Sequence, residues 1–184
     1  MTIAQKEIIL PNGKTIVIKS ALPENALSII EHRTITSGET DFLGRYPEEV
    51  NKDVDFISKF IQDIQKSPDE FMVTAFDGDR VIGDSAVTHL KSNIKYRHRA
   101  YFGISIQKEF WGMGLGTVML ESAIINAAAA GFDQLELGVF SDNVAAIHLY
   151  EKCGFKSYGI QPRAFKLKDG RYCDDIIMVK FLDA

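Results

Sequence analysis

The sequence has few cysteines and no long hydrophobic run. Cys153 and Cys173 are the two cysteines among 184 residues, too few for a disulfide framework and not spaced as metal ligands. The longest mixed apolar stretch, Ser122 to Phe132, falls well short of the ~20 residues that cross a bilayer. We therefore expect no membrane span, no metal site and a reducing, cytoplasmic setting.

The sequence also lacks a signal peptide and a strong excess of charge of one sign. Met1 to Glu7 has neither the basic start nor the apolar stretch of a secretion signal, so secretion is not expected. The 25 acidic and 21 basic residues give a net charge of −4, without the basic excess typical of nucleic-acid binders. The basic run from Lys91 to Arg99 is more typical of a solvated hairpin loop. We expect neither a nucleic-acid partner nor a membrane partner.

Neither an internal repeat nor a linker divides the chain, which predicts a single domain over residues 1–184. Hydrophobic periodicity and turn residues predict the order β, α, α, β, β, β, α, β, α, β, β. The predicted strands span residues 14–19, 71–76, 81–90, 99–106, 133–140, 155–159 and 174–182. The predicted helices are one that begins at Pro23 with Ala26, Leu27 and Ile30 on one stripe, two that span 47–66 and 114–130, and a short one that is capped by Asp142 or Asn143 and ends at Gly154.

Two of these strand pairs define the fold class. The Asp77-Gly78 turn between two β-rich runs predicts an antiparallel hairpin. The strands at 99–106 and 133–140 are joined by a long helix, which makes them a parallel pair in a βαβ unit. The sequence therefore predicts an α/β fold, a single-domain, mixed and mostly antiparallel central sheet flanked by helices.

A glycine-rich segment, Gly112-Met113-Gly114-Leu115-Gly116, leads from the strand that ends at Ile106 into the long helix. Because glycine has no side chain, the amides at the helix N-terminus can approach an anion closely. A nucleotide P-loop would need a lysine after the last glycine, where this chain has Thr117, and the even spacing does not suit a dinucleotide loop. A pyrophosphate loop for coenzyme A fits better, although glycine triplets also occur for packing reasons.

Two segments resemble the Gcn5-related N-acetyltransferase (GNAT) superfamily. The glycine segment is similar to the family's Gln/Arg-x-x-Gly-x-Gly/Ala loop, with Trp111 in place of the polar residue. The stretch from Asn143 to Phe155 is similar at each motif position to the family's Asn-x-x-Ala-x-x-Leu-Tyr-x-x-x-Gly-Phe segment. On a helix, Asn143, Ala146 and Tyr150 lie on one face, while Leu149 and Cys153 point elsewhere. The resemblance covers residues 70–182 well and 14–35 weakly, and it implies the GNAT fold.

The resemblance also implies the residues that bind acetyl-CoA. Backbone amides from Gly112 to Thr117 would hold the pyrophosphate, and the edge of the strand at Ile104 to Ile106 would pair with the pantetheine arm. Asn143 would bond to that arm, and Tyr150 would stand near the sulfur as the general acid. The implied cofactor-binding set is Ile104, Ile106, Trp111, Gly112, Met113, Gly114, Gly116, Thr117, Asn143 and Ala146.

The acceptor side of the site stays open. Glu39 and Asp41, in the loop expected between the first two helices, are candidates for attracting an ammonium group, and Glu136 is a third candidate. Some family members carry a glutamate base where this chain has Ala100. The remaining candidates for the base are Asp84, His89, Glu136, Glu39 and Asp41, of which strand alternation sends Asp84 and His89 to opposite faces.

These observations favour an acetyl-CoA-dependent N-acetyltransferase that acts on a primary amine by direct attack. The acceptor is a small-molecule amine or a protein N-terminus, and the sequence does not choose between them. Ala100 and Trp111 motivate an alternative, a non-catalytic coenzyme A binding module or sensor. An edge strand near the C-terminus offers a pairing surface for a homodimer.

Overall fold

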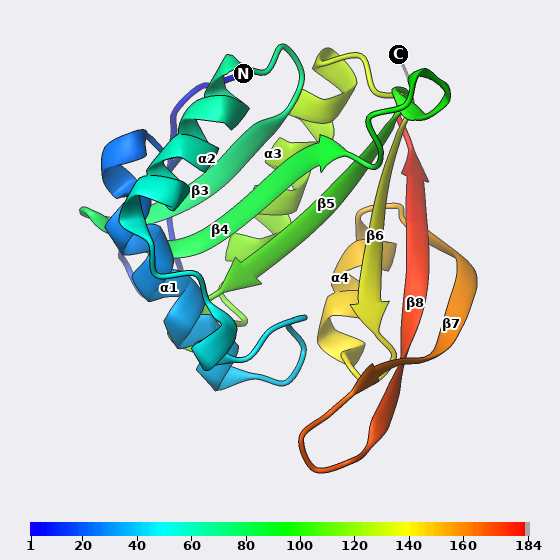
Figure 1. Cartoon of the computed structure of the whole chain (residues 1–184). Helices are drawn as coiled ribbons and strands as arrows, with labels where there is room; N and C mark the ends of the chain where they lie inside the picture. The colour runs from blue at the N-terminus through cyan, green and yellow to red at the C-terminus, as the bar shows by residue number, and fades with distance from the viewer. Residues whose placement is uncertain (183–184) are drawn as a thin grey trace.

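The computed structural model describes residues 1–182 and contains one eight-stranded sheet with helices on both of its faces (Figure 1). Its strands are β1 (Lys6–Ile9), β2 (Thr15–Lys19), β3 (Phe71–Asp77), β4 (Arg80–His89), β5 (Arg99–Ile106), β6 (Gln134–Phe140), β7 (Lys156–Lys166) and β8 (Tyr172–Phe181). Its helices are α1 (Ala26–Glu39), α2 (Val54–Lys66), α3 (Leu115–Ala129) and α4 (Val144–Lys152), with short 3-10 turns η1 (Pro23–Asn25), η2 (Pro47–Glu49), η3 (Ile94–Tyr96) and η4 (Lys108–Phe110).

The strands lie in the order β1-β2-β3-β4-β5-β6-β8-β7. Only β5 and β6 are parallel among the described strands, which confirms the mixed, mostly antiparallel α/β sheet. The parallel pairing covers only Arg99–Tyr101 of β5 and Gln134–Glu136 of β6. Beyond it the two strands diverge, and a gap opens inside the sheet (Figure 1).

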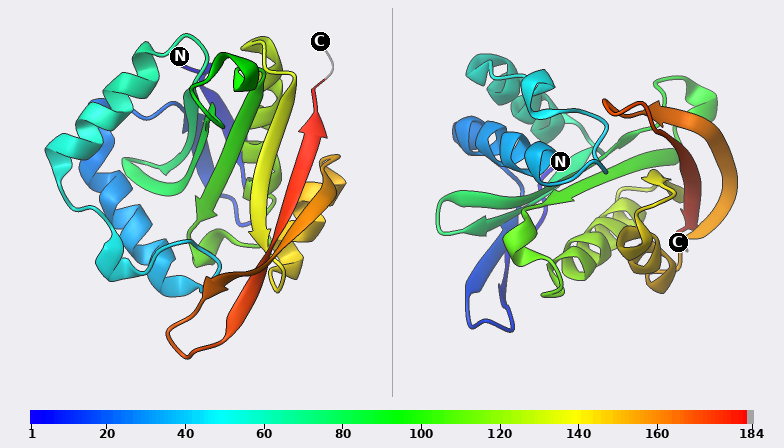
Figure 2. Two further views of the ribbon diagram at one scale, coloured as in Figure 1. Left: turned by 45° about the vertical axis from the view of Figure 1, so that its right-hand side comes forward. Right: turned by 90° about the horizontal axis from the view of Figure 1, so that it is seen from below.

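Two apolar cores hold the helices against the sheet. α1 and α2 lie on one side and α3 and α4 on the other, as the right-hand view of Figure 2 shows. The core on the α1 and α2 side includes Ile29, Ile57 and Ile61, and the larger core under α3 includes Met119 and Leu120. The helices therefore cover part of each face, and the sheet is open to a ligand where β5 and β6 part.

The first two helices differ from the prediction at their ends. α1 continues through Glu39, so residues 36–39 are helical rather than loop, and the Thr36 hydroxyl donates to the carbonyl of His32 at 2.9 Å. Leu27 is exposed, and Ile29 takes its place in the buried stripe. The second helix begins at Val54 rather than residue 47, because the Asp53 carboxylate caps it by accepting from the Phe56 amide at 3.0 Å.

Other boundaries agree with the prediction or extend it. The hairpin of β3 and β4 and the strand β5 are confirmed, and α3 ends just before Gly131, which has a φ of +87°. The short edge strand β1 was not predicted, and β7 runs on to Lys166 rather than ending at residue 159. None of the helices in residues 1–182 is both long and apolar enough to cross a membrane. The single domain over 1–184 stays a prediction, and its last two residues lie outside the described part.

Candidate active site

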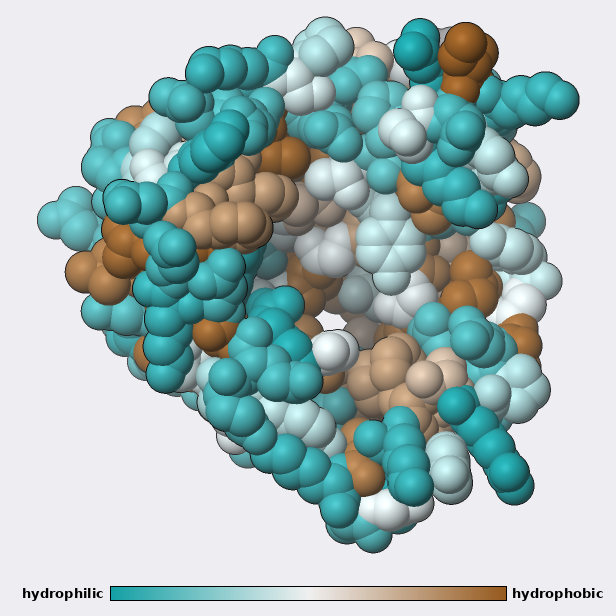
Figure 3. Space-filling view, in the orientation of Figure 1, coloured by the Kyte–Doolittle hydropathy of each residue, from teal (hydrophilic) through white to brown (hydrophobic). Residues whose placement is uncertain are grey.

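A cavity of about 1080 Å³ opens where β5 and β6 diverge. Its walls come from α1 and the loop 40–46, from β4 and β5, from the glycine segment with the start of α3, and from α4, β6 and β8. The space-filling view in Figure 3 shows the hollow at the centre of the same face. The predicted parallel pair therefore does border the main cavity of the described chain.

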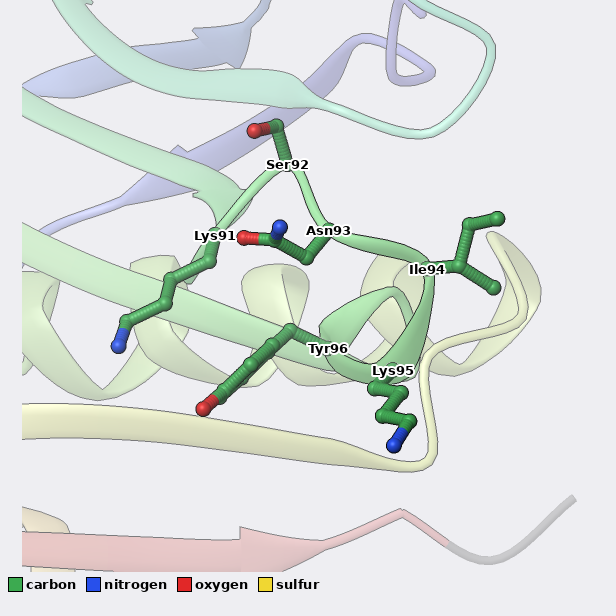
Figure 4. A pocket seen from close by; sticks show the side chains of 6 residues that line it. All are labelled: Lys91, Ser92, Asn93, Ile94, Lys95 and Tyr96. Carbon is green, nitrogen blue, oxygen red and sulfur yellow. The ribbon is translucent and has the colours of Figure 1, made fainter.

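A second, shallower depression lies on the predicted basic loop. It is lined by residues 91–96 alone, and Figure 4 shows their side chains pointing in several directions around one turn. Residues 91–95 are exposed, and the Lys91 ammonium lies 4.8 Å from the centre of the Tyr96 ring. This segment has the solvated character expected of a hairpin loop.

The open edge of β5 presents backbone groups to the cavity. The Gln107 amide donates to the carbonyl of Ile82 at 3.0 Å, and Ser105 pairs with Asp84 on β4. Backbone alternation then turns the amides and carbonyls of Ile104 and Ile106 away from β4 and toward the gap. The indole of Trp111 already donates to the Ile106 carbonyl at 2.7 Å. The Ile104 carbonyl and the two amides face the space where a ligand would pair.

The three glycines of the segment have different structural roles. Gly112 and Gly114 have φ values of +73° and +83°, which residues with a Cβ rarely adopt. Gly116 instead allows close packing, because a Cβ there would lie 3.2 Å from Leu149 and 3.4 Å from Ile106. The first helical bond of α3 runs from the Val118 amide to the Gly114 carbonyl, so the amides of residues 115–117 precede it. Those amides suit an anion at the helix N-terminus.

Helix α4 brings its predicted face to the opposite wall. Asn143 caps the helix by accepting from the Ala146 amide at 3.2 Å, which leaves its NH2 group as a donor. Asn143, Ala146 and Tyr150 all line the cavity, but so does Leu149, which was expected to point elsewhere. Burial raises the pKa of the Tyr150 phenol, so the hydroxyl stays protonated at neutral pH.

One residue of the predicted donor-binding set lies outside the cavity lining. That residue is Met113, whose sulfur accepts from the Asn12 side chain at 3.4 Å. The side chain also packs against the core. The other residues of the set surround the cavity: Ile104, Ile106, Trp111, Gly112, Gly114, Gly116, Thr117, Asn143 and Ala146.

The three acidic residues predicted to attract the acceptor do not line the cavity. Glu39 accepts from the Lys108 amide at 2.8 Å, and Asp41 lies 3.8 Å from Arg171. Glu136 is buried and accepts two bonds from Arg99, at 2.5 and 2.8 Å. Burial opposes ionisation of Glu136, but bonds from Arg99, Tyr158 and Gln134 hold its pKa below the usual range. Glu136 is thus part of a buried contact, whereas Glu39 and Asp41 make exposed contacts outside the cavity lining.

Asp84 and His89 lie on opposite faces of β4, as alternation predicts. Asp84 lines the cavity, but its carboxylate accepts from Arg33 at 3.0 Å. His89 bonds to Asp69 at 2.9 Å and packs edge-on against Phe132, away from the cavity lining. Asp84 is therefore committed to the pair with Arg33, and His89 does not reach the cavity.

Asp175 on β8 was not among the predicted site residues. It lines the cavity, and its Oδ1 is buried without a hydrogen-bond partner among the described residues. A Cβ on Gly138 would lie 2.6 Å from its Oδ2, so glycine at that position of β6 leaves room for the carboxylate where it now lies. Burial raises the pKa of Asp175, against a lowering bond from the Val139 amide. A carboxyl of this kind is suited to accepting a proton.

A buried histidine fixes the start of the glycine segment. His32 on α1 is fully buried and contacts the Ser105 hydroxyl at 2.9 Å and the Gln107 amide nitrogen at 3.4 Å. Burial lowers the pKa of His32 to about 4, so the imidazole is neutral at pH 7. Gln107 also donates to the Val81 carbonyl at 3.0 Å. These bonds tie α1, β4 and the end of β5 together.

The tip of the β7–β8 hairpin bridges the two sides of the cavity mouth. The Lys168 amide donates to the Tyr46 hydroxyl at 2.9 Å, and the Lys168 ammonium lies 4.2 Å from the centre of the Tyr46 ring. Lys168 also pairs with Glu48. Further in, the ring of Phe42 lies 6.0 Å from that of Phe140. Residues 40–48 and 165–171 thus meet across the gap.

Comparison with known proteins identifies the family. Residues 36–155 match the acetyltransferase (GNAT) family, and this protein belongs to that family. The L-amino acid N-acetyltransferase AaaT of Escherichia coli (strain K12) is 31% identical over 114 residues, 59% of this chain and 66% of the relative. The ribosomal protein bS18-alanine N-acetyltransferase of the same strain is 38% identical over 77 residues, 42% of this chain and 51% of the relative. The matches thus span between half and two thirds of these relatives.

Solved structures share the fold over nearly the whole chain. An acetyltransferase of the GNAT family from Streptococcus pneumoniae is 29% identical, with a TM-score of 0.86 over 91% of this chain and 99% of its own. A protein from Salmonella typhimurium, solved with its cofactor acetyl-CoA, is 21% identical, with a TM-score of 0.80 over 91% and 94%. At that identity the second structure shows the fold alone.

Proposed function

We propose that this protein is an acetyl-CoA-dependent N-acetyltransferase that acetylates a primary amine by direct attack. The observation that carries the proposal is the continuity between the open edge of β5 and the N-terminus of α3. An extended arm can pair with Ile104 and Ile106, and its pyrophosphate then meets the amides from Gly112 to Thr117. Family membership supports acetyl-CoA as the donor.

The donor's thioester belongs at the Ile104 end of the gap, because the arm enters past Ile106 from the glycine segment. The Ile104 amide faces the gap and can donate to the thioester oxygen as negative charge develops there. The NH2 group of Asn143 can bond to the pantetheine arm from the opposite wall. Tyr150, whose phenol is protonated at neutral pH, can donate a proton to the departing sulfur.

Asp175 is the proton acceptor in this proposal. The amine nitrogen attacks the thioester carbon, a new C–N bond forms, and the C–S bond breaks. The proton lost by the amine passes to Asp175, and the thiolate takes its proton from Tyr150. Neither Cys153 nor Cys173 lines the cavity, and burial raises the pKa of each thiol, which agrees with transfer without an acylated cysteine.

The names of two relatives bear on the class of acceptor. One relative is named for L-amino acids and the other for an alanine of a ribosomal protein, so both names specify an amino group of an amino acid or a protein. A small-molecule or peptide amine is therefore proposed for this chain. The cytoplasmic setting and the homodimer both stay predictions. For the homodimer, β7 is the edge strand near the C-terminus, and its two register shifts disfavour pairing with a second copy.

The test is release of free coenzyme A thiol from acetyl-CoA in the presence of pooled amines. The pools are amino acids, polyamines, aminoglycosides and short peptides, each with and without the protein. Amine-dependent release supports the transferase, and splitting the active pool identifies the acceptor class. If acetyl-CoA raises the melting temperature while no pool releases thiol, the binding-module alternative is favoured instead.

A further inference from the structure

The charged side chains that line the cavity are divided between two walls. Arg33, Arg45 and Asp84 come from α1, the loop 40–46 and β4, on one side of the gap. Asp142 and Asp175 come from the end of β6 and from β8, on the other side. They are the charged residues of the cavity lining within residues 1–182. The first wall therefore has one positive charge in excess, and the second wall is negative.

Arg33 is already compensated by its neighbour. Its Nη2 and Nε lie 3.0 and 3.3 Å from the same oxygen of Asp84, which is buried. Its guanidinium also lies 5.9 Å from the centre of the Phe60 ring. These contacts fix the position of Arg33 and neutralise its charge, so the excess charge belongs to Arg45.

Arg45 has no such partner within the described chain. Its Nε is buried without a hydrogen-bond acceptor, and no carboxylate of residues 1–182 forms an ion pair with it. Burial and then the nearby Arg33 lower the pKa of Arg45, against a smaller raising effect of Asp84, which forms no ion pair with it, and the guanidinium remains charged at neutral pH. A buried charged donor without an acceptor is costly, and a planar oxyanion satisfies its fork of N–H groups.

We infer that Arg45, positioned beside the Arg33–Asp84 pair, binds a carboxylate of the acceptor substrate. The acceptor is then a small amine that also carries a carboxylate, such as an amino acid. This assignment rests on the proposed acetyl transfer. It also uses the division of charge, because the negative wall with Asp175 can receive the ammonium end of the same molecule.

The test compares each amino acid with its carboxamide, which keeps the amine and loses the negative charge. For the wild type we expect the carboxylate form to have a kcat/KM at least about tenfold higher, the value of one charged hydrogen bond. Arg45→Gln should abolish this preference through KM, and Arg45→Lys should retain part of it. Arg97→Gln is the matched control, because Arg97 is exposed on the β4–β5 loop outside the cavity lining and should leave the preference unchanged.

Each further result decides the assignment. Equal activity on acids and amides in the wild type overturns it while the transferase stands, and so does a preference that survives Arg45→Gln. A rise in the dissociation constant of acetyl-CoA, without loss of the preference, assigns Arg45 to the donor and overturns it as well. Dipeptides and their amides separate a free amino acid from a peptide carboxylate.

If the wild type releases no thiol with any amine, the proposed function fails and calorimetry decides the subsite. Pooled amino acids are then titrated into the coenzyme A-loaded wild type and Arg45→Gln. Binding that is weakened in the variant supports the carboxylate subsite, and absence of binding to the wild type overturns it. Melting curves confirm that the variants are folded, with Arg45→Lys as the substitute if Arg45→Gln is not.

Discussion

The two halves of the cavity are assembled from the sequence in different ways. The half proposed to bind the donor comes from two continuous segments, the end of β5 with the glycine loop and the start of α3, and the helix α4. The half proposed to bind the acceptor is assembled from three regions far apart in the chain: Arg33 and Arg45 on α1 and the loop after it, Asp84 on β4, and Asp175 on β8. A site that binds its ligand with backbone amides can be recognised from local sequence spacing. A site that binds with side chains from distant segments can be recognised only in the folded chain.

The largest expected effect lies in the acceptor half. Asp175→Asn should lower kcat by about a hundredfold or more, the usual contribution of a positioned base. Because burial raises the pKa of Asp175, the wild-type rate should rise with pH through that pKa, and the variant should lose this rise. Steady-state kinetics across pH measure both. The control is Asp174→Asn, since Asp174 accepts from the Arg163 amide at 2.8 Å and lies outside the cavity lining.

The same variant has an opposite effect on stability. A carboxyl whose pKa is raised by folding stabilises the native state least once it is ionised, at pH values above that pKa. Asp175→Asn should therefore raise the melting temperature at pH 7 while it lowers kcat. A fall in both would indicate a merely structural carboxylate and would break the comparison between the two halves.

The next effect tests the donor half. Tyr150→Phe should lower kcat by about a hundredfold, because the thiolate then leaves without a positioned acid. The dissociation constant of acetyl-CoA should change little, since the ring that packs against Phe155 at 5.9 Å is retained. Tyr158→Phe is the control, because that phenol bonds to Glu136 outside the cavity lining. Equal losses in the two variants would contradict the role of Tyr150.

A smaller effect is expected from the loop backbone. Gly114→Ala places a Cβ at a φ of +83°, which costs roughly 1–2 kcal/mol in a residue with a side chain. Relaxation of the loop should weaken acetyl-CoA binding about tenfold, the effect of 1.4 kcal/mol. Gly159→Ala adds the same atom where the space is open, so its binding should match the wild type in calorimetry.

The smallest effect on activity should come from Glu136. Glu136→Gln removes the carboxylate that Arg99 and Tyr158 share, but Glu136 does not line the cavity, so kcat/KM should change less than about twofold. Stability should fall by about 2 kcal/mol, less than for a fully buried pair because Arg99 is 26% exposed. Thermal unfolding measures the loss. A large change in KM for the amine would restore Glu136 as an acceptor residue.

Much of the fold was predictable because its signals are local. The Asp77-Gly78 hairpin, the glycine that ends α3 and the parallel pair around it were all readable from turn residues and periodicity. The end of α1 was not, because Thr36 and Ser37 have low helix propensity and are held by burial and by the Thr36 bond to His32. Tertiary packing there overrides a composition typical of a loop.

In the site, the sequence predicted the donor half of the cavity better than the acceptor half. The glycine segment and the stretch from Asn143 to Tyr150 were found by spacing, and all of their residues line the cavity except Met113, Ile147 and His148. Asp175 stands beside Asp174 in the sequence, and only the strand register, which pairs Asp175 with Phe140, brings its carboxylate beside Gly138. Arg45 lies in a loop whose path no periodicity describes. Glu39 and Asp41, in the expected loop, instead contact the Lys108 amide and the Arg171 side chain.

The contact of Lys168 with Tyr46 and Glu48 joins the two sides of the cavity mouth. Its ion pair is exposed on both sides, and such pairs contribute little to stability and weaken in salt. The sheet beneath it is joined across the gap by three residue pairs and the buried Arg99–Glu136 contact. The contact across the mouth is therefore far weaker than the strand pairing and the ion pair behind it. Raising the ionic strength weakens the Glu48–Lys168 pair first and leaves the β5–β6 pairing intact.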